Sequence, residues 1–148
     1  MGLAERVIPL IGDAALILGS TTAGCLRSDR NTLHLSSAGT TYLGPAGADS
    51  NPPGWLPLWQ RSLTQCHWQP DIRSILLAKT AVNAVINPLT ALHQVKNGAL
   101  LQPELLSSTE AAITEVQRLL TAADETVIAD ALPGRVNAIC QATSENYS

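Results

Sequence analysis

Three polar side chains stand out in a long apolar stretch that runs from Ile75 to Leu92. Lys79 is the only charged residue in this stretch, and Asn83 and Asn87 are its only amides. An α-helix turns about 100° per residue, so residues four apart lie almost above one another. The three side chains therefore share one face of a predicted helix that is otherwise mostly aliphatic and is expected to be buried on most sides. Because a buried polar group without a partner costs about 1–3 kcal/mol, the row indicates that something polar sits against it.

The same row has an interpretation that needs no ligand. Lys79 could reach solvent from a partly exposed helix, and the two asparagines could bond to neighbouring backbone. Pro88 is expected to end or kink the helix, because it lacks an N–H group and disfavours helical geometry at the residue before it. Asn97 and Gly98 are expected to close the segment as a helix stop or turn.

The spacing of these residues resembles the central helix of a known enzyme family. Lys-x-x-x-Asn-x-x-x-Asn-Pro-Leu-Thr-Ala, with Asn-Gly beginning ten residues after the second Asn, is similar to the motif of the ketopantoate reductases (2-dehydropantoate 2-reductases). The resemblance implies reduction of 2-dehydropantoate to pantoate with NADPH, in pantothenate biosynthesis. It further implies that Lys79 is the catalytic general acid. Asn83, Asn87 and Asn97 would hold the substrate's carboxylate and hydroxyl through their amide groups.

The resemblance covers about residues 15–148, and only the middle of the family's proteins. It implies an α/β remnant in residues 1–70, formed by the last strands and one helix of a Rossmann-type, NADP-binding domain. Residues 71–148 would begin an all-α substrate and catalytic domain of the 6-phosphogluconate-dehydrogenase C-terminal-like type. The Gly-rich first half that binds NADPH, and the later substrate-binding serine and catalytic glutamate, are expected to lie outside this chain. Met1-Gly2-Leu3-Ala4 resembles the end of the family's Asn-Gly-(Met/Leu)-Gly motif but lacks its Asn.

The presence of Lys79, Asn83, Asn87 and Asn97 together favours an enzyme fragment that is inactive on its own, whereas the missing ends favour a non-catalytic product. Two alternatives stay open. The chain could be a non-catalytic helical interaction module or a decayed gene product, or it could come from a related reductase that acts on another 2-oxo acid. Sheet edges and helix faces that lack their neighbours are also expected to promote self-association.

Length and composition indicate a globular protein. The chain has 148 residues, of which 45% are hydrophobic and 14% are charged, and its net charge is −3. This balance argues against a nucleic-acid or membrane-surface partner. Three widely spaced cysteines predict neither a disulfide framework nor a metal site, so we expect a cytoplasmic protein. The apolar stretch from Val7 to Leu18 is too short and too interrupted for a membrane span or a signal peptide.

The first 70 residues are expected to hold the strands. Ala14–Ser20 reads as a buried strand, and Ala23-Gly24-Cys25 reads as a loop. The resemblance implies that the backbone of Cys25 lies near the cofactor, although a buried small thiol is an equally good interpretation of Cys25. A short helix is expected over residues 1–13. Residues 31–36 and 40–43 are expected to form a hairpin in which Leu33 and Leu35 point inward and His34 points outward. A loop over 44–54 without Gly-x-Gly-x-x-Gly spacing, an amphipathic helix over 53–65 packed on the sheet, and a short extended piece over 66–69 would follow.

From Asp71 onward, the pattern predicts helices only. The central helix is expected over residues 72–87, with a shorter helix over 89–95 after Pro88. One turn would begin at Pro103, and the capping-box pattern from Ser107 to Glu110 would open a further helix. That helix carries an apolar row of Ile113, Val116, Leu119, Leu120 and Ala123. The last helix is expected to begin near Pro133 and to continue to the final residue.

Overall fold

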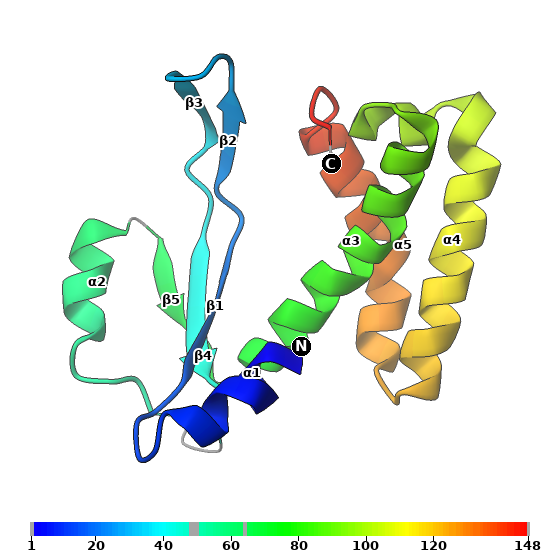
Figure 1. Cartoon of the computed structure of the whole chain (residues 1–148). Helices are drawn as coiled ribbons and strands as arrows, with labels where there is room; N and C mark the ends of the chain where they lie inside the picture. The colour runs from blue at the N-terminus through cyan, green and yellow to red at the C-terminus, as the bar shows by residue number, and fades with distance from the viewer. Residues whose placement is uncertain (1, 48–50, 64, 148) are drawn as a thin grey trace. The chain divides into compact units, whose positions relative to one another are not determined.

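The computed structural model describes residues 2–47, 51–63 and 65–147, and the chain forms two compact units, residues 1–76 and 77–148. All described strands lie before residue 69 (Figure 1). After that point the described chain is helical apart from its connections. The expected order, an α/β part followed by an all-α part, is therefore confirmed. One helix, α3 (Ile72–His93), contributes residues to both units.

The first unit is built on a mixed three-stranded sheet in the order β1-β4-β5. β1 (Ile17–Thr21) pairs antiparallel with β4 (Thr41–Pro45), and β4 pairs parallel with β5 (Cys66–Trp68). A parallel pair needs a crossover connection, and α2 (Leu56–Ser62) supplies it beside β5 (Figure 1). Two short elements precede the sheet, α1 (Gly2–Val7) and the 3₁₀ turn η1 (Ile8–Leu10). The expected strand, helix and extended piece in these regions are confirmed in position, but β1 is not a buried strand, because Ser20 is its one buried residue.

The second, two-stranded sheet corrects the expected hairpin. β3 (Leu33–Ser37) pairs with β2 (Gly24–Arg27), whereas β4 pairs with β1, so residues 31–36 and 40–43 do not pair with each other. The turn between β2 and β3 is stabilised by a hydrogen bond within the turn. The Asp29 carboxylate accepts this bond from the Asn31 backbone N–H at 2.8 Å. Between the two sheets, the Thr22 N–H donates to the Thr40 carbonyl at 3.0 Å, and Gly39 (φ 59°) lies so close to Ala23 that a side chain would clash there.

The core of the first unit is small. Leu43, Leu56 and Cys66 are buried together, with Ile17 and Trp68 packed against them. Two expectations about this unit are wrong. Leu33 and Leu35 do not point inward but are 68% and 70% exposed, because nothing described in this unit covers the β2–β3 sheet. In the amphipathic pattern over 53–65 only Leu56 is buried, while Trp55, Leu58, Trp59 and Leu63 are exposed. Residues 48–50 of the expected loop, and Thr64, lie outside the described residues.

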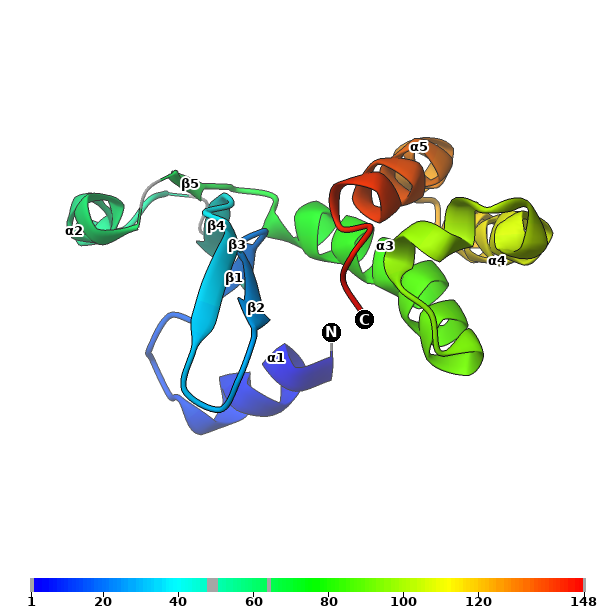
Figure 2. The same ribbon diagram turned by 90° about the horizontal axis from the view of Figure 1, so that it is seen from above.

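The second unit packs α3 against α4 (Pro103–Ala122), α5 (Thr126–Ala142) and the 3₁₀ helix η2 (Asn97–Leu101). α4 and α5 lie side by side in both views (Figures 1 and 2). Buried residues recur along α3 and α5 at spacings of three and four, as expected of helices that each bury one face. The fully buried members of this core include Val85, Ile86, Leu100, Leu132, Val136 and Cys140.

Helix boundaries in the second unit differ from the expected ones at two prolines and one capping box. α3 continues through Pro88 to His93 as a single helix, and α5 begins seven residues before Pro133. A proline inside a helix leaves the carbonyl four residues earlier without its usual donor. For Pro133 this carbonyl belongs to Ala129, and the Gln117 side chain of α4 donates to it at 2.9 Å. The expected capping box at Ser107 lies inside α4, which begins at Pro103 instead.

The chain leaves α5 several residues before the last residue of the sequence. α5 ends at Ala142, so the expectation that the last helix continues to the final residue is wrong. The following segment, Thr143–Tyr147, is called the tail below. It runs against the start of η2: the Asn97 N–H donates to the Asn146 carbonyl at 2.9 Å, and the Gly98 N–H donates to the Ser144 carbonyl at 3.2 Å. Gly98 is needed here for close approach, since an added Cβ would lie 2.8 Å from the Ser144 Cβ.

Candidate functional site

The helix that carries the candidate site begins at a well-defined cap. The Asp71 carboxylate accepts a hydrogen bond from the Ser74 backbone N–H at 3.2 Å and another from the Ser74 hydroxyl at 2.5 Å. Both bonds lower the pKa of Asp71, because they stabilise its charged form. At the other end, Gln94 takes a left-handed conformation (φ 54°), and the Val95 N–H bonds back to the Thr90 carbonyl at 3.1 Å. The helix therefore ends at His93, and Asn97 and Gly98 begin η2 instead of closing α3.

Lys79, Asn83 and Asn87 lie four residues apart along α3, so the helix brings them onto one face. All three are exposed, while Ala78, Ala81, Val82, Val85 and Ile86 on the other face are buried. The expectation that this helix is buried on most sides is therefore wrong for the described chain: α3 is amphipathic, and the polar row faces outward. An ammonium and two amides give this face of the helix a row of hydrogen-bond donors and acceptors.

Asn97, the fourth predicted site residue, lies apart from this row in sequence and in burial. It is only 5% exposed, and its Nδ2 group donates to the Thr143 hydroxyl at 2.8 Å. Thr143 in turn donates to the Ile139 carbonyl at 2.7 Å. The side chain of Asn97 thus joins η2 to the end of α5. Sequence reasoning did not single out Thr143 for any role, because a threonine near a helix end carries no signal of a partner 46 residues away.

Cys25, whose backbone was expected near a cofactor, lies in β2 and not in a loop. It is exposed and pairs with Leu35 next to a register shift at Gly24, so the interpretation as a buried small thiol is wrong. The other two cysteines, Cys66 and Cys140, are buried free thiols, and burial raises the pKa of the Cys140 thiol. Among the residues that the structure describes, no group of three or more His, Cys, Asp or Glu side chains could hold a metal ion.

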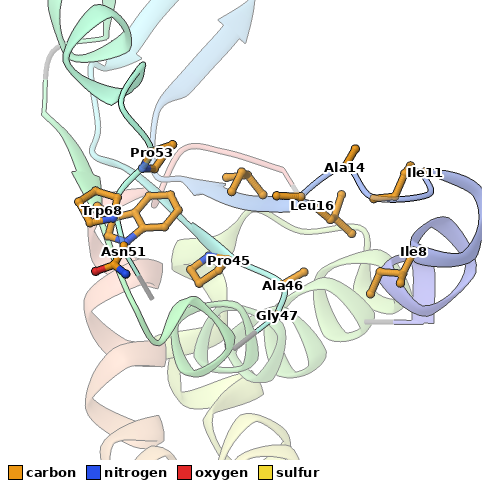
Figure 3. Close-up of a pocket in the computed structure, with 13 residues that line it drawn as sticks. Ile8, Ile11, Ala14, Leu16, Pro45, Ala46, Gly47, Asn51, Pro53 and Trp68 are labelled. Atoms are coloured by element: carbon orange, nitrogen blue, oxygen red, sulfur yellow. The ribbon is translucent and has the colours of Figure 1, made fainter. Parts of the chain in front are cut away.

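An apolar hollow of about 370 Å³ lies entirely within the first unit (Figure 3). Ile8, Ile11 and Leu16 line it on one side, and Pro45, Pro53 and Trp68 line it on another. None of the predicted site residues contributes to its wall. α3 also has the length and apolar composition of a membrane span, which for a single helix is weak evidence, and one third of that stretch is buried, including Val85 and Ile86 in the helical core.

A mixed sheet followed by a helical unit, with a lysine and two asparagines along its first helix, defines a two-part protein of the α/β and all-α type. A model of the family described as "Ketopantoate reductase PanE/ApbA C terminal" matches residues 71–148, more than half of the chain. The chain belongs to this family.

Named relatives agree with the family. A 2-dehydropantoate 2-reductase of Vibrio cholerae is 33% identical over 149 residues, which cover 100% of this chain and 50% of that protein. A protein of the same name from Escherichia coli O157:H7 is 33% identical over 138 residues, 90% of this chain and 43% of that protein. The crystal structure of a probable 2-dehydropantoate 2-reductase from Bacillus subtilis is similar with a TM-score of 0.71 and 30% identity, over 100% of this chain and 50% of that one. The chain thus spans about half the length of the relatives it matches.

Proposed function

We propose that the chain is part of an NADPH-dependent reductase that converts 2-dehydropantoate to pantoate, an activity that belongs to pantothenate biosynthesis. One observation carries the proposal: Lys79, Asn83 and Asn87 share one exposed face of α3, within the segment that matches the family. Ketone reduction needs a proton for the developing alkoxide and positive charge beside it. An ammonium on a regular helix supplies both.

In this proposal each residue has its own task. Lys79 donates the proton from Nζ to the oxygen that was the keto group and stabilises its negative charge until the transfer is complete. Asn83 and Asn87 donate hydrogen bonds from their amide groups and hold the substrate in one orientation, which favours reaction by restricting its motion. Asn97 would contact the same substrate from η2. All four residues lie on elements that are fixed by the core of the second unit.

The cofactor fits this chain only in part. NADPH supplies the hydride for such a reduction, and a dinucleotide is held by a Gly-rich loop at a helix N-terminus. The printed sequence contains no Gly-x-Gly-x-x-Gly run, and in the described residues the candidate contact, the backbone of Cys25, lies in a paired strand. These residues do not form a pyrophosphate cradle, so the chain on its own is proposed to be inactive.

The proposal extends to the two units and to the compartment. The first unit would be the last part of the NADP-binding domain. The second would be the first part of a substrate domain of the 6-phosphogluconate-dehydrogenase C-terminal-like type. A cytoplasmic location is supported by the three free thiols. Self-association is supported by exposed leucines such as Leu33, Leu35, Leu92 and Leu119.

A chimera tests the function directly. The 148 residues would replace the segment that they match in the Bacillus subtilis protein, and turnover would be measured with NADPH and a panel of 2-oxo acids. We expect 2-dehydropantoate to be the preferred substrate and Lys79→Met to reduce its turnover by at least about 10²-fold. A folded chimera that is inactive with every 2-oxo acid would contradict the proposal. A preference for another 2-oxo acid would keep the reductase chemistry but change the substrate.

A further inference from the structure

Pro88 lies inside α3, one residue after the candidate site residue Asn87. A proline disfavours helical geometry at the residue before it, and it leaves the carbonyl four residues earlier without its usual helical donor. The sequence alone therefore predicts that the helix ends or kinks near Asn87. In the structure Asn87 stays helical, and α3 continues to His93. An interaction that stabilises this turn in spite of the proline is therefore expected.

Thr90 supplies such an interaction from the buried side of the helix. Its side chain is 2% exposed, and its hydroxyl group donates to the backbone carbonyls of Ile86 at 2.9 Å and Asn87 at 3.1 Å. The single hydroxyl proton is shared between the two carbonyls, as in a three-centre hydrogen bond. A bond to the carbonyl four residues earlier is common for a helical threonine, and two exposed threonines of α4 make it. The bond of Thr90 to the carbonyl of Asn87, three residues earlier, is additional.

The two carbonyls that Thr90 holds belong to the peptide groups on either side of Asn87. Only the φ and ψ angles of Asn87 rotate one of these groups against the other, so a hydroxyl bonded to both keeps both angles helical. Before a proline, the backbone otherwise favours a φ that is about 60° from the helical value. Because φ sets the direction of the Asn87 Cα–Cβ bond relative to the preceding turn, that change would turn the side chain away from Lys79 and Asn83.

We propose that Thr90 is a positioning residue that keeps Asn87 in one row with Lys79 and Asn83. Thr90 is buried and acts only through the backbone of Asn87. A valine would fill the same space in the core but could not bond to the two carbonyls. The consequence for catalysis rests on the proposed function, in which this row holds a 2-oxo acid substrate.

Nuclear magnetic resonance on the labelled 148-residue chain tests the positioning without any ligand. The main readout is the three-bond coupling between the amide and α protons of Asn87, which reports its φ angle. Thr90→Val keeps the shape and removes the hydroxyl, while Thr90→Ser keeps the hydroxyl. Thr109→Val is the matched control. Thr109 is also buried, at 1% exposure, and its hydroxyl bonds to the carbonyls of Leu100 and Leu105, each at 3.0 Å.

We expect Thr90→Val to raise the Asn87 coupling roughly twofold, because φ moves away from the helical value. Amide exchange at Ala91, whose helical acceptor is the Asn87 carbonyl, should become roughly tenfold faster, as for the loss of about one hydrogen bond. Thr90→Ser and Thr109→Val should leave the Asn87 coupling at its helical value. An unchanged coupling in Thr90→Val overturns the proposal. An equal rise in Thr109→Val also overturns it, because general loosening of the core would then be the cause.

A Pro88→Ala background keeps the test decisive if Thr90→Val does not fold in the natural chain. Without the proline the helix is regular at Asn87, so Thr90→Val should then fold and leave the coupling unchanged. A coupling that rises in both backgrounds, or loss of folding in both, would show that Thr90 serves the core and not the turn before the proline.

Kinetics of the chimera test the link to the proposed function. Thr90→Val should raise the Michaelis constant as much as Asn87→Ala does, and the two changes together should raise it no further, with kcat within about twofold. If the Asn87 coupling changes but the Michaelis constant does not, the positioning by Thr90 holds and the proposed substrate role of Asn87 fails. If neither changes, Thr90 has no positioning role.

Discussion

The side-chain amide of Gln117 donates a hydrogen bond to the backbone carbonyl of Ala129 at 2.9 Å. Ala129 lies four residues before Pro133, so its carbonyl is the one that the proline leaves without a helical donor. Ala129 is buried, and a buried carbonyl without a partner is costly. A residue of α4 thus makes a proline acceptable in the middle of α5, and the pair also links the two helices.

This relationship predicts a dependence between two substitutions. Gln117→Met should lower the free energy of unfolding by about 1–3 kcal/mol, because it leaves the Ala129 carbonyl unpaired. In a Pro133→Ala background the same substitution should cost only about 0.5 kcal/mol, since an alanine at this position can donate the regular helical bond. Urea unfolding of the four proteins measures the coupling. Equal costs in both backgrounds would show that Gln117 does not serve the proline.

A second prediction concerns Lys79 in the chimera. Lys79→Ala should reduce turnover by about 10²–10⁴-fold, the usual contribution of general acid catalysis, while NADPH affinity changes little. Lys79→Arg should restore little, because a guanidinium does not give up a proton near neutral pH. Steady-state kinetics with cofactor binding measured separately gives both quantities.

The control for Lys79 is another cation of the same helix. Arg73 is exposed near the start of α3, six residues before Lys79 and about 120° away from it around the helix. Arg73→Met should leave turnover within about twofold, which separates a specific proton donor from general loss of positive charge. Full activity in Lys79→Met would remove Lys79 from the mechanism and favour the interpretation in which it only reaches solvent.

The asparagines should separate by their effect on stability. Asn97→Ala should lower the free energy of unfolding of the chain by about 1–3 kcal/mol, because it removes a buried amide together with its hydrogen bond to the Thr143 hydroxyl. Asn83→Ala and Asn87→Ala should stay within about 0.5 kcal/mol of the unchanged chain, since both side chains are exposed and alanine favours a helix. In the chimera these two changes should raise the Michaelis constant. Large destabilisation by Asn83→Ala or Asn87→Ala would indicate a structural role.

The ion pair between Lys96 and Glu145 predicts a pH dependence of the tail. The bond and charge of Lys96 lower the pKa of Glu145, and those of Glu145 raise the pKa of Lys96. The pair's contribution is therefore present at neutral pH. It is lost in acid, as the pH falls from about 4.3 through the lowered pKa of Glu145, and in alkali, as the pH rises from about 10.4 through the raised pKa of Lys96.

Thermal melts of the unchanged chain and of Glu145→Gln test this sign. Their melting temperatures should differ slightly at pH 7 and converge as the pH falls through the lowered pKa of Glu145, because both chains then carry a neutral side chain at position 145. High salt should reduce the difference, because both groups are exposed to solvent. A difference that grows in acid would contradict the assignment.

Much of the second unit could be predicted from sequence, because its helices bury residues at regular spacings. Lys79, Asn83 and Asn87 fall on one face of α3 as their spacing predicts. The errors come from partners far away in sequence. Pro133 looks like a helix start until Gln117 is seen to bond to the Ala129 carbonyl. Thr143 looks like one more helical residue until it is seen to accept a bond from Asn97.

The first unit was less predictable, because alternation along a strand does not identify the pairing strand. Residues 31–36 alternate well enough for a hairpin with 40–43, but the turn at Asp29 pairs β3 with β2 instead. Alternation also implies one covered face, yet Leu33 and Leu35 are both exposed. Roles toward substrate and cofactor stay predictions for all of the site residues, Cys25 and Asn97 included.

The docking of the tail also affects the chemical lifetime of the protein. An Asn followed by Gly is prone to lose ammonia, because the glycine nitrogen can attack the asparagine side-chain carbonyl unhindered and close a succinimide ring. Here the Gly98 N–H is bonded to the Ser144 carbonyl, and the Asn97 amide is bonded to Thr143. The attacking and attacked groups are both held by the tail, so Asn97 should age slowly in the folded chain. Peptide mapping of stored protein should find deamidation at Asn97 only after the tail is released, and the same bonds that order the site would then also preserve its amide.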